Sequence, residues 1–246
     1  MPMIYLSPST QEKNYYVNGG TEEQYMNLLA DKMVPYLNAS GIRYSRNTPE
    51  MTAVSSIAAS NAGNYDLHLA LHSNAAPEGK YGTARGIIVF YYPGSQEGQR
   101  AATIIANNLK SIYPLPNLVR AEATTSIGEV RRVRAPAVFL ELGYHDNPED
   151  AAWIKQNLDA VAKNLVMSLC DYFDIPFLDP STSRSGRVDV DWGVLNIRAR
   201  PDLDAPILAQ APDGAPLTIL NQAGGWYLVN YAGTIGYAKD DFVTLN

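Results

Sequence analysis

Hydrophobic periodicity changes between residues 174 and 186, and this change divides the chain into two regions of different fold class. Before it, apolar residues recur at helical spacing in some segments and alternate or run together in others. After it, no helical period remains. The stretch itself is rich in Pro and Ser, which is typical of a linker. We therefore predict two domains, at residues 1–176 and 187–246, joined by a linker at 177–186.

In the first region, segments typical of strands alternate with segments typical of helices. Met26, Leu29, Met33 and Leu37 recur at helical spacing after a possible N-cap at Thr21. Short segments at 4–6, 42–45, 66–72, 86–92 and 136–142 predict strands, and further helices are expected within 52–62, 96–112 and 148–173. This alternation predicts an α/β domain with a mostly parallel sheet sandwiched by helices.

The second region contains only short strand-like segments, separated by Gly, Pro and Asp turns. They lie at 188–191, 195–198, 207–208, 217–220, 226–231 and 235–238. Such regular spacing predicts a small SH3-like β-barrel.

Composition and charge exclude several function classes. The 246 residues are 46% hydrophobic with a net charge of −6, which argues against nucleic acid as a partner. No apolar run approaches the roughly 20 residues of a membrane span. Met1 is followed by a strand-like segment rather than by a signal peptide. The lone Cys170 lies in an apolar helical pattern, so we expect it to be a buried core residue.

Three residues of the first region are candidates for chemistry. His72 and Glu141 end predicted strands, where the functional groups of α/β sheets gather, and Glu23 opens the first long helix. A carboxylate that closes an apolar run needs a compensating partner, such as a metal ion. Each residue also has a purely structural interpretation. Glu23 suits a helix N-terminus, His72 could be a hydrogen-bonded strand-end residue, and Glu141 could pair with an arginine that precedes it.

The second region resembles the bacterial SH3 (SH3b) family. The motifs are residues 195–201 (LNIRARP), Gly214, residues 225–229 (GWYLV) and residues 236–238 (GYA). The resemblance implies binding to the bacterial cell wall, often to peptidoglycan peptides. Tyrosines suit such a ligand because they are amphipathic, and they could equally fill the barrel. The substrate-binding candidates are Tyr227, Tyr231 and Tyr237, and Trp226 is expected to fill the barrel.

The first region resembles the zinc-dependent N-acetylmuramoyl-L-alanine amidases of the Amidase_3 family. That family carries D-P-G-H, E-x-x-x-N-L, S-I-H-x-N and P-x-x-L-V-E-x-G-F motifs in this order. Their counterparts here are residues 7–10 (SPST), 23–28 (EQYMNL), 71–74 (LHSN) and 136–144 (PAVFLELGY). The similarity covers residues 3 to about 175.

The resemblance implies that Glu23 and His72 are zinc ligands and that Glu141 is the catalytic base. Asn74, in the counterpart of S-I-H-x-N, becomes a substrate-binding candidate. Zinc with an open position makes water acidic enough to ionise near neutral pH. The bond cut would be the amide between N-acetylmuramic acid and L-alanine.

The chain departs from the family at the first zinc ligand, where it has Thr10 instead of His. Carboxylate oxygen binds zinc better than an amide does, so Glu12 is the preferred third ligand, with Thr10, Gln11 and His145 as alternatives. His68 and His72 share a strand face but lie about 13 Å apart, so they cannot ligate one ion. We expect His68 to be a core or interface residue.

The sequence therefore predicts a zinc-dependent peptidoglycan hydrolase that an SH3b module targets to the cell wall. The alternative is a catalytically inactive wall-binding protein on an amidase scaffold, favoured by the missing His. A third class, a cysteine peptidase, is disfavoured because Cys170 has no nearby His motif. Action at the bacterial wall without a signal peptide fits a phage lysis enzyme or a mature secreted form. The sequence leaves the oligomeric state open.

Overall fold

The computed structural model describes residues 1–180 and 183–246. The chain divides into two compact units, and each is described by itself. The first contains residues 1–38 and 42–177, and the second contains residues 39–41 and 178–246. This division falls within the predicted linker at 177–186, of which residues 181 and 182 lie outside the described residues.

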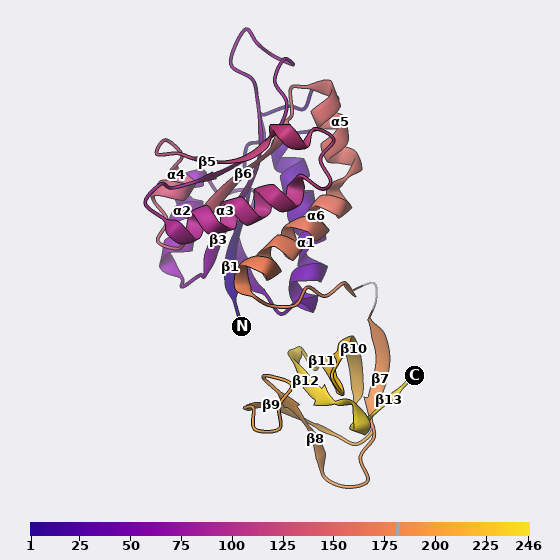
Figure 1. Ribbon diagram of the computed structural model, residues 1–246. Coiled ribbons are helices and arrows are strands. Elements are labelled where there is room, and N and C mark those ends of the chain that lie inside the picture. The colour runs from indigo at the N-terminus through magenta and orange to yellow at the C-terminus, as the bar shows by residue number, and fades with distance from the viewer. Residues whose placement is uncertain (181–182) are drawn as a thin grey trace. The chain divides into compact units, whose positions relative to one another are not determined.

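The first unit is built on a six-stranded sheet with the order β2-β1-β3-β6-β4-β5 (Figure 1). The strands are β1 (Met3–Pro8), β2 (Arg43–Arg46), β3 (Leu67–Asn74), β4 (Ile87–Tyr91), β5 (Val119–Ala123) and β6 (Ala137–Tyr144). All neighbours are parallel except β4 and β6, which are antiparallel. The sheet is therefore mostly parallel, as predicted. The short strand β5 was not expected from the sequence.

Six helices accompany this sheet. They are α1 (Glu22–Ala39), α2 (Ala53–Ala62), α3 (Gln96–Leu109), α4 (Gly128–Arg131), α5 (Pro148–Gln156) and α6 (Leu158–Phe173). A short 3-10 helix, η1 (Pro116–Leu118), precedes β5. The helical segment predicted within 148–173 is divided at Asn157, which caps α5 at its C-terminal end. The single-turn helix α4 has no hydrophobic period of its own, so only the structure reveals it.

The two faces of the sheet have different surroundings. On one face, Leu67, Leu69 and Leu71 of β3 belong to the large core, together with apolar residues of α1, α3 and α6. On the other face, Ala70 packs in a smaller cluster with Val130 of α4. Since side chains alternate along a strand, His68 and His72 lie on this second face, towards α4. Figure 1 shows α3 and α6 crossing in front of the sheet.

The second unit is a seven-stranded antiparallel sheet with the order β13-β7-β10-β11-β12-β8-β9. Its strands are β7 (Arg184–Val188), β8 (Val194–Arg198), β9 (Ile207–Pro212), β10 (Pro216–Ala223), β11 (Trp226–Tyr231), β12 (Thr234–Lys239) and β13 (Val243–Leu245). A 3-10 helix, η3 (Asp240–Phe242), precedes the last strand. The fold class predicted for both regions is confirmed.

One boundary needs correction. The sequence predicted a linker to residue 186 and a strand over 188–191, whereas β7 already begins at Arg184. Gly186 explains the difference, because a Cβ at this position would lie 2.7 Å from Ile219 and 3.0 Å from a backbone oxygen of Thr244. This glycine permits close packing inside a strand and is not part of a linker.

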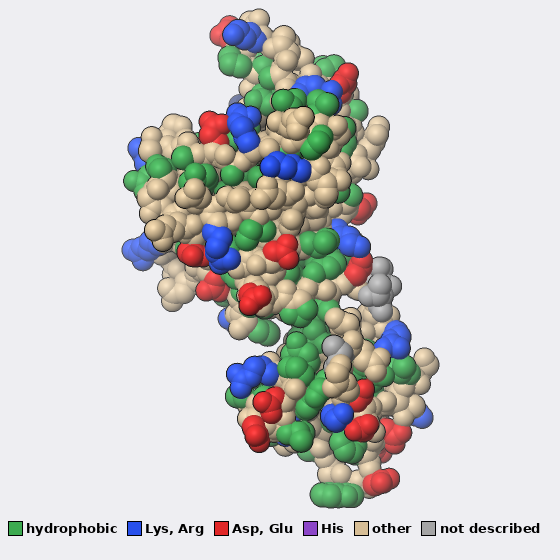
Figure 2. Space-filling model, viewed as in Figure 1, with side chains coloured by type: hydrophobic (Ala, Val, Ile, Leu, Met, Phe, Trp, Pro, Cys, Tyr) green, Lys and Arg blue, Asp and Glu red, His purple; other side chains and the backbone are tan. Residues whose placement is uncertain are grey.

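Two further expectations concern buried and membrane-spanning segments. Cys170 is buried on α6, in the large core. Among the residues that the structure describes, no helix is both long and apolar enough to cross a membrane. Figure 2 shows basic and acidic side chains interspersed over the visible face of the molecule.

Candidate functional site

The candidate site lies where three neighbouring strands end. β1, β3 and β6 are adjacent and parallel, so their carboxyl ends meet at one edge of the sheet. His72 of β3 and Glu141 of β6 are register partners. The imidazole of His72 also stacks on the ring of Phe139, with 4.1 Å between the ring centroids. The structure thus brings together the two strand-end residues that the sequence singled out.

The acid from the first helix that reaches His72 is Glu22. Its Oε1 lies 2.7 Å from His72 Nδ1, and its side chain is only 1% exposed. Asn14 donates a hydrogen bond of 2.6 Å to Glu22 Oε2. The predicted ligand Glu23 is half-buried, and its backbone carbonyl accepts a hydrogen bond from Asn27. The geometry therefore assigns the position beside His72 to Glu22 instead of Glu23.

A signal for Glu22 was present in the helical period. Met26, Leu29 and Met33 are fully buried on one stripe of α1. Glu22 lies four residues before Met26 and seven before Leu29, so it continues that stripe towards the sheet. Glu23 is out of phase with the same stripe. The family motif and the hydrophobic period thus select neighbouring residues, and packing of the helix decides between them.

A second carboxylate, from Glu129 of α4, approaches His72 from the other side of its ring. Its Oε2 lies 3.4 Å from His72 Nε2, and its Oε1 lies 3.3 Å from His68 Nε2. Ser7 donates a hydrogen bond of 2.6 Å to Glu129 Oε1. No motif pointed to Glu129, because its partners lie between 57 and 122 residues away in the sequence.

His68 is a buried core residue, as expected, and it belongs to this network. Its Nε2 faces Glu129, and its Nδ1 lies 3.0 Å from the Ser60 hydroxyl. The buried polar network therefore runs from Glu22 through His72, Glu129 and His68 to Ser60.

The charges of the network depend on one another. Burial alone would lower the pKa of His72, but hydrogen bonds to Glu129 and Glu22 raise it to about 10. Burial alone would raise the pKa of Glu129, but hydrogen bonds from His68 and His72 lower it to about 2. Burial alone would also raise the pKa of Glu22, but the interaction with His72 and a hydrogen bond from Asn14 lower it. These shifts favour a protonated His72 between two ionised carboxylates.

Glu141 differs from the other two acids because it lacks a partner. Its Oε2 is completely buried and has no hydrogen bond among the described residues. Burial raises the pKa of Glu141 to about 8, while the charge of His72 acts in the opposite direction. A carboxyl group tuned close to neutral pH and free of hydrogen bonds can take up and release a proton.

The loop after β1 contributes a side-chain amide. Gln11 Nε2 lies 3.4 Å from His72 Nδ1, and Asn14 donates a hydrogen bond of 2.9 Å to Gln11 Oε1. Glu12, the preferred third ligand from the sequence, is exposed and has no side-chain contact with this network in the described part of the chain. Of the residues considered in this loop, Gln11 is the one that reaches His72.

His145 and Asn74 hold the chain around the site. His145 is buried, its Nδ1 lies 2.9 Å from the Ser73 carbonyl oxygen, and its ring stacks on Tyr16. These contacts account for the burial of His145, and we therefore interpret it as a structural residue. Asn74 ends β3, where its Oδ1 accepts a hydrogen bond from the backbone of Ala75.

A cleft of about 440 Å³ opens beside His72 and Glu129. Its remaining lining residues are Ser7, Pro8, Thr10, Gln11, Asn47, Met51, Thr52, Ala53 and Ser56. Asn47 is buried, and its Oδ1 has no hydrogen-bond partner among the described residues. The cleft thus combines titratable groups with small polar side chains, and it is large enough for part of a sugar-peptide substrate.

The donors of this site match a zinc ion in part. Glu22 supplies carboxylate oxygen and His72 supplies imidazole nitrogen, which are both common zinc ligands. The buried carboxylates of Glu22 and Glu129 both contact His72, so together they carry more negative charge than one imidazolium balances. Glu141 Oε2 is a buried oxygen without a hydrogen bond among the described residues. A bound cation would compensate both. Within residues 1–180 and 183–246, no three His, Cys, Asp or Glu side chains form a metal-binding group. The nearest further side chain is Gln11, whose Nε2 faces His72 and whose Oε1 accepts a hydrogen bond from Asn14, so its amide would have to turn to offer oxygen as a third ligand.

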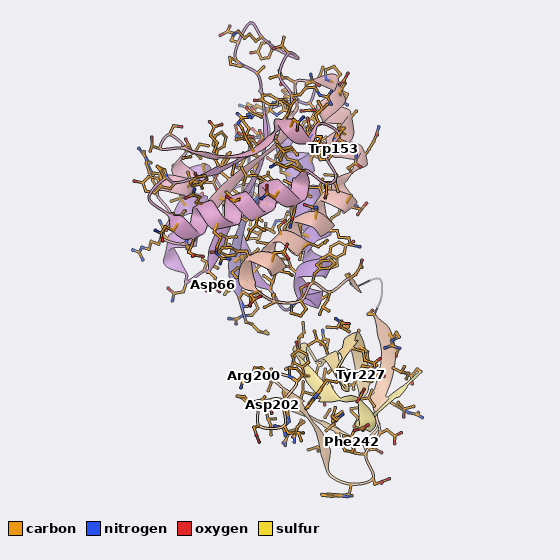
Figure 3. All side chains as sticks on the ribbon, viewed as in Figure 1. Asp66, Trp153, Arg200, Asp202, Tyr227 and Phe242 are labelled. Atoms are coloured by element: carbon orange, nitrogen blue, oxygen red, sulfur yellow. The ribbon has the colours of Figure 1, made fainter. Side chains whose placement is uncertain are left out.

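The second unit carries a separate groove of about 510 Å³. Trp192, Trp226 and Phe242 contribute aromatic side chains to it, and Arg198 and Lys239 contribute cations. Trp192 is 89% exposed, which is unusual for a side chain of this size. Figure 3 labels Phe242 on this unit.

The three tyrosines predicted to bind substrate lie elsewhere in the second unit. Tyr227 is 7% exposed and belongs to the barrel core, and Tyr231 packs against this core. Tyr237 is half-buried on β12. None of the three lines the groove. Trp226 is buried, as expected for a barrel-filling residue, and one side of it also faces the groove.

Comparisons with known proteins agree with this fold. The chain is similar to the amidase AmiC2 of Nostoc punctiforme, with a TM-score of 0.61 and 14% identity over 70% of this chain and 97% of that one. It is also similar to the catalytic domain of the amidase CwlV from Bacillus (Paenibacillus) polymyxa var. colistinus, with a TM-score of 0.62 and 14% identity over 72% and 100%. The catalytic domain of the CD27L endolysin, which targets Clostridia difficile, gives a TM-score of 0.58 and 21% identity over 70% and 98%.

Sequence profiles assign both units. No curated protein matches the chain. The profile of the bacterial SH3 domain matches residues 193–244. The profile of the N-acetylmuramoyl-L-alanine amidases matches residues 9–170, which is more than half of the chain. The chain therefore belongs to the Amidase_3 family of N-acetylmuramoyl-L-alanine amidases and carries a C-terminal bacterial SH3 domain.

Proposed function

We propose that this protein hydrolyses the amide bond between N-acetylmuramic acid and L-alanine in bacterial peptidoglycan, with a zinc ion in the first unit. One observation carries the proposal: the unpaired Glu141 carboxyl lies beside the Glu22–His72 pair at the ends of neighbouring strands. This arrangement provides a base next to two types of zinc ligand, and the polar cleft opens beside the same His72.

Glu22, His72 and Gln11 would hold the metal in this proposal, in place of the set Glu23, His72 and Glu12 suggested by sequence. When bound, zinc would supply polarisation of the scissile carbonyl and a water acidic enough to ionise near neutral pH. The ligand set is less basic than a set with two histidines, because an amide oxygen replaces an imidazole.

Glu141 acts as the general base and then as the general acid. Its carboxylate takes a proton from the attacking water and later delivers it to the nitrogen of L-alanine as the amide bond breaks. The raised pKa of about 8 suits both steps, because the group can be ionised before attack and protonated afterwards. Asn74, at the end of the same strand as His72, is the proposed contact to the substrate.

The groove of the second unit is proposed to bind the cell wall. Aromatic side chains beside cations suit a short polar peptide, since they offer both stacking surface and hydrogen-bond donors. In this proposal the contact residues are Trp192 and Phe242 rather than the three tyrosines. Binding by this unit would keep the first unit at the cell wall, where its substrate is concentrated.

The proposal is tested by the products formed from purified sacculi. Hydrolysis of this bond creates a free α-amino group on L-alanine, which can be labelled with a chromophore and identified by mass spectrometry. We expect new L-alanine termini, their loss after treatment with a chelator and their return when zinc is added. Release of a different amino terminus, or activity that resists exhaustive chelation, would contradict the proposal.

A second candidate is a wall-binding protein without hydrolytic activity. The observation that favours it is the third donor, since Thr10 replaces the family's His and only the amide of Gln11 reaches His72. In that case, the purified protein would bind sacculi, contain less than stoichiometric zinc and release no L-alanine termini. Metal analysis together with the product assay therefore distinguishes the two candidates.

A further inference from the structure

Glu129 occupies a position that the chemistry above does not use. It lies on the one-turn helix α4, is 5% exposed, and its two carboxylate oxygens point to different histidines. Its Oε2 faces Nε2 of His72, on the opposite side of the ring from Glu22. A buried carboxylate is costly unless several groups bind it, and here Ser7 and two imidazoles do so.

The two nitrogens of His72 therefore have different partners. Glu22 and Gln11 lie at Nδ1, on the side of the β1 loop, and Glu129 lies at Nε2. A neutral imidazole carries a hydrogen on only one nitrogen, and the partner of that hydrogen determines which nitrogen keeps a free lone pair. Glu22, at Nδ1, is itself a proposed metal ligand, so with a cation between Glu22 and Nδ1 the one remaining hydrogen is at Nε2, where Glu129 accepts it.

We propose that Glu129 is a positioning residue that accepts the Nε2–H of His72 and fixes the orientation of the ring, so that Nδ1 is the nitrogen left for a metal ion that Glu22 also binds. Metal-binding histidines generally donate their other ring N–H to a carboxylate or carbonyl, which fixes both tautomer and ring orientation. The metal part of this inference rests on the proposed function, whereas the orientation of His72 does not.

His68 completes the arrangement by fixing Glu129. The hydroxyl of Ser60 lies 3.0 Å from Nδ1 of His68, and Nε2 of His68 lies 3.3 Å from Glu129 Oε1. If the serine donates to Nδ1, the hydrogen of His68 is at Nε2 and points at Glu129. Ser7 and His68 thus both bind Oε1 of Glu129, and Oε2 remains for His72.

The experiment uses the full chain with Glu129→Gln, which preserves the shape of the side chain and removes its charge. Glu122→Gln is the matched control, because Glu122 lies on β5 with a 46% exposed side chain and pairs only with Arg120 among the described residues. The chain has only three histidines, so their ring nitrogens can be assigned by ¹H–¹⁵N spectroscopy with His72→Gln as the reference. Zinc affinity is measured by competition with a chromophoric chelator.

In the metal-free wild type, we expect a downfield Nε2–H resonance of His72 that exchanges slowly with water. Glu129→Gln should shift this resonance and speed its exchange, and it should weaken zinc binding by roughly 10- to 100-fold. Glu122→Gln should change neither quantity. Thermal unfolding of each variant shows whether the fold is retained.

Two results would overturn the inference: an Nε2–H resonance that does not respond to Glu129→Gln, or a changed resonance with unchanged zinc affinity. The second result would leave Glu129 as a structural residue only. If the wild type binds no zinc while the resonance depends on Glu129, the zinc proposal fails and the orienting role of Glu129 is supported.

Discussion

The two units carry cavities of similar size with opposite chemistry. The cleft of the first unit measures about 440 Å³ and lies beside buried acids and histidines, whereas the groove of the second measures about 510 Å³ and is lined by aromatic side chains. Glu22 and Glu129 are almost inaccessible, but Trp192 is 89% exposed. Proton transfer needs groups whose pKa values are shifted by burial, and adhesion needs accessible apolar area.

This difference supports a separation of the two proposed activities, hydrolysis in the first unit and wall binding in the second. A substitution at the buried network should change hydrolysis with little effect on wall binding. A substitution at the exposed groove should do the opposite. The following variants test that separation.

The largest effect is expected for Glu141→Gln. The amide cannot accept a proton, so release of L-alanine termini should fall by roughly 10²- to 10⁴-fold. Binding to sacculi, measured by co-sedimentation, should stay unchanged because the groove lies in the other unit. Retained hydrolysis would remove Glu141 from the mechanism, and reduced binding would show that the two properties are coupled.

The neighbouring acids of α1 provide the next comparison. Glu22→Gln should lower zinc affinity by on the order of 100-fold, because it removes the carboxylate that faces His72 Nδ1. Glu23→Gln should leave the affinity within about twofold, since Glu23 lies off the buried stripe of the helix. Metal content after dialysis against a zinc buffer measures both. A larger loss of zinc affinity in Glu23→Gln than in Glu22→Gln would instead support Glu23, the ligand suggested by the sequence motif.

An effect of intermediate size is expected in the groove. Trp192→Ala removes an exposed aromatic side chain and should weaken sacculus binding about tenfold, or roughly 1.4 kcal/mol. Ile207→Ala is a suitable control, because Ile207 is 49% exposed on β9 and does not line the groove. Hydrolysis of small soluble muropeptides should be equal in both variants. Equal loss of sacculus binding in the two variants would argue against a specific groove.

The smallest effect is expected for Tyr237→Phe. This variant removes only a hydroxyl from a half-buried side chain outside the groove, so sacculus binding should stay within about twofold of the wild type. A larger loss of sacculus binding, measured by co-sedimentation, would indicate that the tyrosines of the second unit contact the cell wall.

Much of the site was accessible from sequence because strand ends are local features. His72 and Glu141 each close an apolar run, and adjacent parallel strands bring such ends together. Glu22 was also within reach, since it shares the helical phase of Met26 and Leu29. The sequence motif nevertheless selected Glu23, because a motif reports spacing to Asn27 and not the rotation of the helix.

The sequence by itself determined the two-domain architecture, the alternation of strands and helices in the first unit and two residues of the candidate site, His72 and Glu141. Only the tertiary structure revealed that Glu129 contacts His72, that Gln11 rather than Glu12 lies beside His72, and that a groove surrounds Trp192. The physical reason is distance along the chain. Strand periodicity and strand ends are encoded within a few residues, whereas the network joins residues up to 122 positions apart and forms only when α4 packs on the sheet.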